Sequence, residues 1–385
     1  MNLPSVKRQA GFTLLEVLIA MAVTLVIVGA AILALRDSMR TNQDVSYRSD
    51  MNDNLRAGLN MIEQDLIQAG TGVPTGGIPI PNTPNSANTC NTTAAPNRPT
   101  LTGTLTFPQC NFVLPAVEPG SALGPLITSP DAVAGNPASP SSYTDIITVL
   151  YADNSLGLDT NPIYSVNSTG TVICNGSINA TGDTVIFDPA CANLGTAGVQ
   201  VQAGDLIMFS NTIGNAIQTV TSVSGQTLKF AAGDPFNLNG RSDPQGTITQ
   251  IQNSTCNSAT PPVCTPNGSY PPTTATRIWM ISYYLDNVTD PQHVRLIRRV
   301  NFNPGQAVGE TLENLQFTYN FIDGVTNPSN QSTVPAGFSE NQIRSVDVFL
   351  GARSNYSDSL QNRYIRSNLQ TQVSLRSMAY RNRYD

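Results

Sequence analysis

The sequence predicts an α+β protein in which a long N-terminal α-helix is followed by a β-rich globular head with long, disulfide-stapled loops. Three observations support this fold class. Residues 12–69 contain no proline and place apolar side chains at helical spacing. From residue 143 onward, short alternating or β-branched runs recur between turn residues, and no helical period of comparable length reappears. The six cysteines all lie beyond the helix.

The first part of the helix is an apolar run from Phe12 to Leu35, in which Glu16 is the single charged residue. At 1.5 Å per residue this run forms a helix of roughly 36 Å, which is enough to cross the hydrocarbon core of a bilayer. Lys7 and Arg8 precede the run, whereas the charges of the two residues after it, at 36 and 37, cancel. The positive-inside rule therefore predicts a cytoplasmic N-terminus and a head on the opposite side.

Two simpler interpretations of the run compete with a functional one. A cleaved secretory signal has a shorter apolar region, about 7 to 15 residues, with the cleavage site after it. An ordinary signal anchor fits the length but does not explain Glu16. A carboxylate near the centre of a membrane helix costs about 2.5 to 3.5 kcal/mol, and less near the interface. A charge kept there indicates a specific partner.

The residues around Glu16 resemble a known signal. The segment KRQAG (7–11) followed by FTLLEVLIAM (12–21) resembles the class III signal of type IV prepilins and type II secretion pseudopilins. The resemblance implies a leader peptide at residues 1–11 with its basic residues at Lys7 and Arg8. It also implies cleavage by a prepilin peptidase between Gly11 and Phe12, and N-methylation of Phe12. Glu16 then becomes the fifth residue of the mature chain.

Cleavage at this point would also give Glu16 a partner. Cutting before the apolar run keeps the helix on the mature protein and creates an α-amino group on Phe12, which is protonated at neutral pH because its pKa is about 8. In the low-dielectric core of a filament this amine needs a counter-charge. We expect Glu16 of a neighbouring subunit to supply it and thereby to set the register between subunits.

Residues 36–70 are predicted to continue the helix as an amphipathic segment. Gly70, Gly72 and Pro74 are stop signals, so we expect one rod from residue 12 to about 69, roughly 87 Å long. A membrane helix followed by a separate amphipathic helix is the alternative, and the rod is favoured because no proline or glycine interrupts residues 30–57. The apolar positions recur mostly three or four apart, with charged residues between them: Leu35, Met39, Met51, Leu55, Leu59, Ile62 and Leu66.

The remaining chain divides by composition. Residues 71–142 are rich in Pro, Gly, Ser, Thr and Asn and predict a long irregular connection. Residues 143–385 are predicted to form the β-rich head, with a tight hairpin at Ser224-Gly225. The candidate strands are 144–151, 163–173, 184–187, 199–209, 216–223, 227–230, 277–285, 294–300, 312–322, 343–350 and 369–378.

The C-terminal third also resembles part of the same family. Its runs resemble the sheet of PilW-like minor pilins and of the related J-type pseudopilins: YYL (283–285), LIRR (296–299), ENLQFTY (313–319) and VSLR (373–376). The resemblance covers residues 5–70 and 277–378. It implies that residues 199–230 are a small inserted β-module of a kind that some PilW-like proteins also carry.

The cysteines predict disulfides in an oxidising periplasm. Six cysteines allow 15 pairings, and we favour the sequential one because each bond would tie a loop rich in Gly, Pro and Asn to itself. The pairs are Cys90 with Cys110, Cys174 with Cys191, and Cys256 with Cys264. No CxxC spacing occurs and the single histidine, His293, falls in a turn, so no metal site is predicted.

The sequence contains no recognisable catalytic constellation. With one histidine there is no plausible Ser-His-Asp or Cys-His arrangement, and the glycines of residues 70–77 do not open a helix after a strand. Asp153, Asn154 and Asp159 could in principle bind calcium, but they lack EF-hand spacing and fit an Asx-rich turn better. We therefore expect no enzymatic activity and no cofactor.

Charge is distributed unevenly along the head. Residues 71–276 carry three basic against ten acidic residues, whereas residues 277–385 carry eleven arginines against nine acidic residues. The arginines could form a basic face for DNA. The favoured interpretation is that they lie at strand edges and in solvent, where they discourage edge pairing. They are Arg295, Arg298, Arg299, Arg363, Arg366, Arg376, Arg381 and Arg383.

Together these features predict a structural and assembly protein, a minor pilin that takes part in the assembly or priming of a type IV pilus or lies at its tip. The expected partners are major and minor pilin subunits, the prepilin peptidase, the inner-membrane assembly platform and membrane lipid, with nucleic acid less favoured. A type II secretion pseudopilin and a pilus-displayed adhesin or DNA-binding receptor are the alternatives. The expected location is the bacterial inner membrane, with a periplasmic head, and then the pilus.

Overall fold

A computed structural model describes residues 11–81, 113–128, 141–195, 200–234, 238–241, 246–260, 262–358 and 363–381. Its main helix, α1, runs without interruption from Leu14 to Gln68. The continuous rod predicted from the absence of helix breakers is confirmed. The helix ends before Gly70 and Gly72, whose φ angles of 77° and 68° lie in the left-handed region that glycine adopts without strain.

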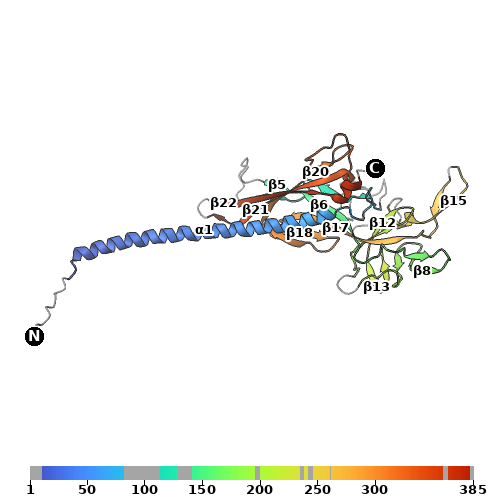
Figure 1. The fold of residues 1–385 in the computed structure, drawn as a ribbon, viewed down its shortest axis with the longest axis horizontal. Coiled ribbons are helices and arrows are strands. Elements are labelled where there is room, and N and C mark those ends of the chain that lie inside the picture. Colours follow the sequence, from blue (N-terminus) through green and yellow to red (C-terminus); the bar gives the residue numbers. More distant parts are fainter. Residues whose placement is uncertain are drawn as a thin grey trace, which may run out of the picture.

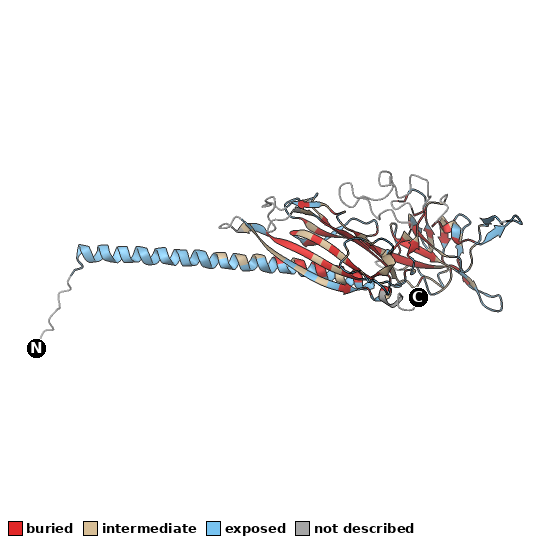
Figure 2. Ribbon diagram, turned by 90° about the horizontal axis from the view of Figure 1, so that it is seen from above, coloured by how far each residue is buried: buried red, intermediate tan, exposed pale blue. Residues whose placement is uncertain are grey.

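The two halves of α1 have different surroundings. Residues 11–39 are all exposed, whereas from Arg40 onward one stripe of the helix is covered by the head (Figures 1 and 2). The predicted amphipathic face of residues 36–70 therefore packs on the head. Its buried apolar residues are no more than 9 % exposed and are Met51, Leu55, Leu59, Ile62 and Leu66.

The larger sheet has seven strands whose neighbours are all antiparallel. Its longest strand, β17 (Thr274–Asp286), pairs along one side with β6 (Ile146–Asp153). Along the other side it pairs first with β11 (Leu206–Ser210) and then with β18 (Arg295–Val300). Strand β17 is thus shared, with β11 beside its first half and β18 beside its second half. The sheet is completed by β3 (Val117–Gly120), β12 (Asn215–Thr219) and β19 (Gln306–Glu310).

A second sheet covers α1 from the other side. It contains β20 (Leu312–Phe321), β21 (Ile343–Asp358) and β22 (Arg363–Ser374), and a short helix α2 (Arg376–Arg381) follows. The helix approaches both sheets at Gly58. A Cβ atom added there would lie 2.8 Å from Leu296 Cδ2 of β18 and 3.3 Å from Leu350 Cδ2 of β21. This helix, the facing strands and their shared core form the proximal lobe.

The head continues beyond the C-terminal end of α1 as a distal lobe, residues 154–273 (Figure 1). The lobe has a core of its own, which includes Phe187, Phe209 and Phe230. Its 3₁₀ helix, η1, is Ile248–Ile251. Besides β11 and β12, its strands are β7 (Tyr164–Val166), β8 (Val172–Asn175), β9 (Ser177–Ile178), β10 (Thr184–Ile186), β13 (Ser222–Ser224), β14 (Thr227–Lys229), β15 (Ser254–Cys256) and β16 (Cys264–Pro266).

The described parts of the stretch predicted as an irregular connection, 71–142, contain several short strands. Strand β3 pairs with β6 at the edge of the large sheet, and at four residues it is too short to show a sequence period. The remaining short elements are β1 (Ile78–Pro79), β2 (Val113–Leu114), β4 (Leu126–Thr128), β5 (Ser141–Tyr143) and, later in the chain, the 3₁₀ helix η2 (Glu340–Gln342).

Four predicted strands also differ from the structure, and one of them, 216–223, divides into β12 and β13 of two different sheets. The stretch 163–173 divides into β7 and β8, because Asn167 Oδ1 accepts bonds from the backbone N–H groups of Thr169 and Thr171 and closes a turn. The stretch 369–378 is a strand only to Ser374, after which α2 begins. Of the predicted strand 199–209, the described part begins at residue 200 and forms a strand only from Leu206.

The stretch 199–230 does not form a sheet by itself. Strands β11 and β12 belong to the large sheet, whereas β13 and β14 join β9 and β10 in a separate four-stranded sheet. The hairpin predicted at Ser224-Gly225 is present, with Ser224 paired to Thr227. The compact unit at this end of the molecule is therefore the whole distal lobe.

Disulfides join Cys174 to Cys191 and Cys256 to Cys264. These are two of the three sequential pairs suggested by the sequence, and both lie in the distal lobe. The first disulfide joins β8 to the loop that contains Cys191, and the second joins β15 to β16. Cys90 and Cys110 lie outside the described residues.

Candidate functional site

The N-terminal end of α1 is built around Thr13 and Glu16. Thr13 is the N-cap residue, and its Oγ1 accepts a hydrogen bond from the Glu16 backbone N–H at 3.3 Å. The Glu16 carboxylate accepts from the Thr13 backbone N–H at 2.9 Å and from Thr13 Oγ1 at 3.0 Å. This reciprocal capping box satisfies donors that have no partner inside the helix, and it places a negative charge at the positive end of the helix dipole.

The capping box gives Glu16 a role within its own chain that the sequence analysis missed. The signal was present, because a threonine three residues before a glutamate at the start of an apolar run is the spacing of a capping box. Glu16 nevertheless remains exposed in the single chain. Its pairing with the Phe12 amine of a neighbouring subunit stays a prediction.

The bond between Gly11 and Phe12 lies in an exposed segment before the helix. Phe12 is 88 % exposed, and nothing lies within 4 Å of a Cβ atom added at Gly11. A peptidase can therefore reach this bond. Packing within the chain does not require a glycine at position 11, so a requirement for a small residue there would come from the peptidase. Lys7 and Arg8 lie outside the described residues.

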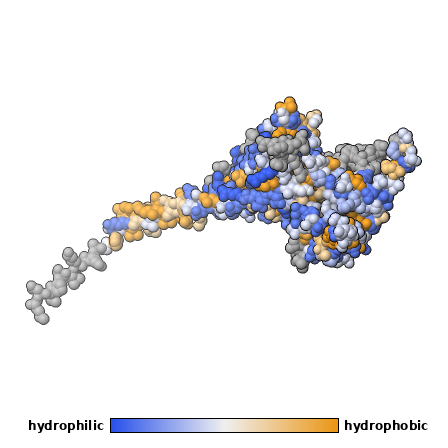
Figure 3. Space-filling view, turned by 45° about the vertical axis from the view of Figure 1, so that its right-hand side comes forward, coloured by the Kyte–Doolittle hydropathy of each residue, from blue (hydrophilic) through white to orange (hydrophobic). Residues whose placement is uncertain are grey.

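The first half of α1 presents an apolar surface on all sides. Leu14, Leu25 and Val26 are 84 %, 71 % and 73 % exposed. Figure 3 shows the hydrophobic colouring concentrated on this part of the helix, before it reaches the head. The helix is long and apolar enough to cross a membrane. Because soluble monomers rarely expose contiguous apolar patches of this size, this half of α1 needs lipid or other subunits around it.

The second half of α1 is joined to the large sheet by a buried polar cluster. The carboxylate of Asp65 accepts hydrogen bonds from Arg298 Nε at 2.8 Å and Arg298 Nη2 at 3.1 Å. It also accepts from the hydroxyl of Tyr283 at 2.5 Å and from that of Tyr151 at 3.1 Å. We call these four residues the Asp65 cluster. It connects the helix to β6, β17 and β18 at one point.

Within the Asp65 cluster, the two tyrosine hydroxyls and the Arg298 guanidinium stay protonated. Burial raises the pKa of the Tyr283 and Tyr151 hydroxyls, and the negative charge of Asp65 raises both further. Burial alone would lower the pKa of Arg298, but its hydrogen bonds and ion pair with Asp65 raise it overall. The two tyrosines therefore remain donors and Arg298 remains a cation, so every bond to Asp65 is charge-assisted.

The sequence predicts other surroundings for two members of this cluster. Asp65 falls among the charged residues between the apolar positions, and Arg298 falls in the candidate basic face or at a strand edge. In the structure Asp65 is 5 % exposed. Its position between Ile62 and Leu66 on the buried stripe was the available signal, because a carboxylate there must meet a cation or donors inside the head.

Other arginines of the candidate basic face are also paired within the chain. Arg295 lies 3.5 Å from Asp286, and Arg366 lies 2.5 Å from Glu313. Arg299 stacks its guanidinium over the ring of Phe302 at 5.0 Å. These three side chains therefore have partners within the chain, and the roles predicted for them in DNA binding or at strand edges stay predictions. Arg383 lies outside the described residues.

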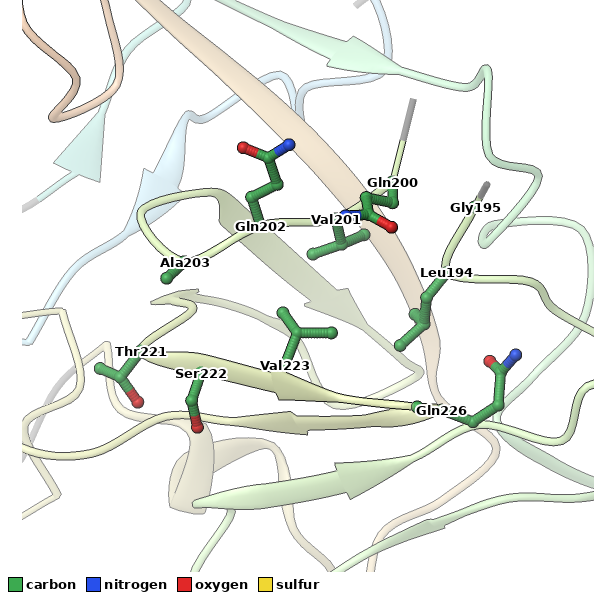
Figure 4. Close-up of a pocket in the computed structure, with 11 residues that line it drawn as sticks. Leu194, Gly195, Gln200, Val201, Gln202, Ala203, Thr221, Ser222, Val223 and Gln226 are labelled. Carbon is green, nitrogen blue, oxygen red and sulfur yellow. The ribbon is translucent and has the colours of Figure 1, made fainter. Parts of the chain in front are cut away.

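The distal lobe contains a surface pocket of about 690 Å³, shown in Figure 4. The residues drawn around it carry amide, hydroxyl or aliphatic side chains, or none, and none of them is ionisable. The described lining therefore offers no nucleophile with a base and no metal ligand set. The lining residues are Leu194, Gly195, Gln200, Val201, Gln202, Ala203, Thr221, Ser222, Val223, Gly225 and Gln226.

Two of the residues considered for metal binding have other partners. Asp153 accepts a hydrogen bond from Arg277 Nε at 2.8 Å and another from the Ser155 backbone N–H at 2.9 Å. His293 is exposed in a turn, with its Nδ1 atom 2.8 Å from Asp290. Within the described ranges, no group of three His, Cys, Asp or Glu residues is arranged to hold a metal ion.

The N-terminal end of the chain matches one protein-family model. The family model described as the prokaryotic N-terminal methylation motif matches residues 6–32. This motif supports a type IV pilin- or pseudopilin-like protein. No curated protein and no solved structure matches the chain.

The matched range of the pilin-like chain includes both Gly11 and Phe12, the capping pair Thr13 and Glu16, and most of the exposed apolar run. The motif implies processing by a prepilin peptidase and assembly with other pilins. Together with the exposed apolar helix it indicates a membrane-anchored pilin-like protein. The candidate site of this molecule is therefore the N-terminal segment that carries the motif.

Proposed function

We propose that this protein is a minor pilin of a type IV pilus. It is cleaved between Gly11 and Phe12, is N-methylated at Phe12, and has no enzymatic activity of its own. The observation that carries the proposal is the contrast within α1. Its first half begins in the methylation motif and has no partner in the described chain, whereas its second half is fixed to the head by a core and by the Asp65 cluster.

The shape of the head supports a low-copy or tip position. A subunit that repeats along a filament must pack its head against subunits above and below. Here the distal lobe, with its own core and two disulfides, extends past the end of α1 along the direction of the helix (Figure 1). Such an extension is compatible with the end of a filament more readily than with its shaft.

Before assembly, α1 holds the protein in the bacterial inner membrane. Lys7 and Arg8 keep the leader on the cytoplasmic side, and the head lies in the periplasm, where its disulfides form. After cleavage, the apolar run leaves the lipid and packs among the helices of other pilins. The capping box keeps the first turn of the helix formed during this transfer, because it depends on the chain alone.

The N-terminal residue of the mature protein tests the proposal. We expect mass spectrometry of the protein from its native host to find a chain that begins with N-methylated Phe12. A Gly11→Trp variant should accumulate as an uncleaved precursor of higher mass, although its head folds normally because position 11 contacts nothing. A mature chain that begins elsewhere, or normal maturation of the variant, would contradict the prepilin assignment.

Deletion of the gene distinguishes the two filament systems. Loss of surface pili with normal protein secretion is expected for a minor pilin. Loss of secretion with normal pili would instead assign the chain to a type II secretion pseudopilin. A complementing copy with Glu16→Ala should be cleaved but should fail to restore the filament, because the Phe12 amine of a neighbour would lack its counter-charge.

A further inference from the structure

The distal lobe contains a second pocket, with a volume of about 330 Å³. It is lined by residues of β7 and β9 and by the segment 268–273, which leads into β17. Small-molecule sites in proteins have volumes of roughly 300 to 1,000 Å³, so a small ligand fits this pocket. The distal lobe extends past the end of α1 (Figure 1), and the pocket is therefore remote from the apolar half of the helix.

Backbone and small side chains keep this pocket open. Its lining includes two Gly-Ser pairs, at 176–177 and 268–269. The chain is closely packed behind Gly176, where an added Cβ atom would lie 2.5 Å from the carbonyl oxygen of Ile163 and 2.6 Å from that of Ile186. A larger residue does not fit at position 176, so the shape of the pocket is set by the strands themselves.

One wall of the pocket is fixed by a buried amide. Gln252 is 3 % exposed, and its Nε2 atom donates to the hydroxyl of Tyr270 at 2.8 Å and to the carbonyl of Ala180 at 2.6 Å. Its Oε1 atom accepts from the backbone N–H of Gly268 at 3.1 Å. The ring of Tyr270 and the backbone at Gly268 are thus held by the chain itself. A preformed pocket lowers the ordering cost of binding.

The two segments that build the pocket are free of charge. Residues 160–182 and 244–276 contain no Asp, Glu, Lys or Arg, although 12 % of the whole chain is charged. Tyr164 is 50 % exposed, and neither its hydroxyl nor that of Ser177 bonds to the described part of the chain. The described lining therefore offers aromatic surface and available hydroxyls, but no charge to bind an ionic ligand.

We propose that this pocket binds a neutral saccharide. A sugar ring has a face of C–H groups that packs on an aromatic ring, and a rim of hydroxyls that bond to side-chain hydroxyls and backbone groups. Tyr164 and Tyr270 supply the aromatic surface, and Ser177 and the Tyr164 hydroxyl supply polar partners. A purely apolar ligand would leave these polar groups unpaired. The proposal goes beyond the proposed function and does not depend on it, because the pocket lies outside the matched motif.

Saturation-transfer difference NMR of the full-length chain can test this binding. The detergent should have a polyoxyethylene headgroup, because the headgroup of a maltoside or glucoside is itself a neutral sugar. We suggest lactose, maltose and chitobiose as neutral probes, and the uronic-acid disaccharide of hyaluronan as the charged probe. We expect transfer to at least one neutral probe, strongest at the C–H protons of one ring face. Chitobiose alone would indicate an N-acetylated ligand, and lactose or maltose alone a ligand without amides; each supports the proposal.

Two variants place the binding in this pocket. Tyr164→Ala should weaken binding about tenfold, near the upper range for a lost aromatic contact. Ser177→Trp should abolish binding, because a large ring then occupies the space. Tyr143→Ala is the matched control, since Tyr143 is 59 % exposed but lies on β5, outside the distal lobe, and it should bind like the parent. Thermal melting verifies that each variant folds, and the exposed position of Tyr164 keeps the test valid if Ser177→Trp does not.

Three results would overturn the saccharide site. The first is a parent chain that transfers saturation to none of the neutral probes. The second is equal binding by the parent and Tyr164→Ala, and the third is tighter binding of the charged probe than of the neutral ones. None of these results would affect the prepilin assignment, which the mass of the mature N-terminus tests separately.

Discussion

The two halves of α1 are one helix in opposite surroundings, and each half has a carboxylate, a leucine and a glycine that can be compared. In the second half Asp65 is bound by three side chains of the head, Leu66 is fully buried, and Gly58 lies against two sheets. The first-half counterparts are Glu16, bound only by its own cap, Leu25, 71 % exposed, and Gly29, with nothing within 4 Å of an added Cβ atom.

This difference distinguishes the side chains of α1 that stabilise the fold from those that remain available for the membrane or for assembly. The second half of α1 is stabilised by the chain's own core, so its side chains are satisfied in the single molecule. The first half is held in a helix by local interactions and the cap, while its apolar surface remains unsatisfied. Substitutions in the second half should therefore change the stability of the head, and equivalent substitutions in the first half should change membrane residence or assembly.

The largest expected effect is that of Leu66→Ala. Removing a fully buried leucine side chain leaves a cavity between the helix and the sheets, and we expect a loss of about 4 kcal/mol in the free energy of unfolding. Urea unfolding of the full-length chain in detergent, followed by the fluorescence of Trp279, measures it, because Trp279 packs against this core. Leu25→Ala is the matched control and should leave the curve unchanged. Equal effects at the two positions would remove the distinction between the halves.

The second prediction compares the two carboxylates. Asp65→Ala leaves Arg298 and two tyrosine hydroxyls without their acceptor, and we expect a loss of about 3 kcal/mol, near the low end for a broken buried pair because the Arg298 side chain keeps 22 % exposure. The same unfolding assay measures it. Asp53→Ala, at an exposed position of the same helix, should change stability by less than about 0.5 kcal/mol.

Glu16→Ala completes this comparison. It should leave the urea curve of the head unchanged and abolish incorporation into filaments, whereas Asp65→Ala should lower stability first. A Glu16→Ala chain that assembles normally would show that the exposed carboxylate serves its own helix cap alone. An Asp65→Ala chain as stable as the parent would show that the Asp65 cluster does not hold the helix to the sheet.

The third prediction is a dependence on alkaline pH that arises in the second half of α1. Burial and the charge of Asp65 raise the pKa of Tyr283 and Tyr151 above the value of about 10 that holds in the unfolded chain. The folded protein therefore keeps protons that the unfolded chain releases. The contribution of the two tyrosines to the free energy of unfolding is therefore fully present below pH 10. It is lost as the pH rises above 10, by up to about 1.4 kcal/mol per pH unit for each tyrosine.

Alkaline unfolding titrations of matched variants measure this dependence. Tyr283→Phe removes one of the two ionisations, so the decline above pH 10 should become shallower even though the variant starts from a lower stability. Tyr164→Phe, at an exposed position in the distal lobe, should leave the slope unchanged. Parallel curves for all three proteins would mean that the Asp65 cluster opens before it ionises.

Local signals explain how much of the fold and site could be predicted. The helix and the apolar run follow from an uninterrupted pattern over neighbouring residues, and the long strands β17, β20 and β21 follow from alternation or β-branched composition. The processing site at Gly11 and Phe12 stays a prediction, made from a resemblance that the basic leader, the small residue and Glu16 carry within ten residues. Each of these inferences needs only residues that are close in the sequence.

The features that were missed depend on contacts between distant residues or on very short segments. Asp65 and Arg298 are 233 residues apart, and the sequence does not show which acidic residue of α1 meets which arginine. Strand β3 is four residues long, and its pairing partner β6 determines that it is a strand at all. The distal lobe combines strands of two sheets, so composition along the chain could not give its boundaries.

The smallest expected effect comes from the two glycines, and it tests how firmly the sheets hold α1. In an open helix position, glycine to alanine gains about 0.5 to 1 kcal/mol through backbone entropy. Gly29→Ala should show this gain as higher helicity of the first half by circular dichroism in detergent. At Gly58 the added methyl meets Leu296 Cδ2 at 2.8 Å, and overpacking should outweigh the gain and leave a net loss of about 1 kcal/mol. A gain in stability at both positions would mean that Leu296 and Leu350 can move to accommodate the methyl group. The core would then be packed less tightly around the helix than the burial of Leu66 indicates.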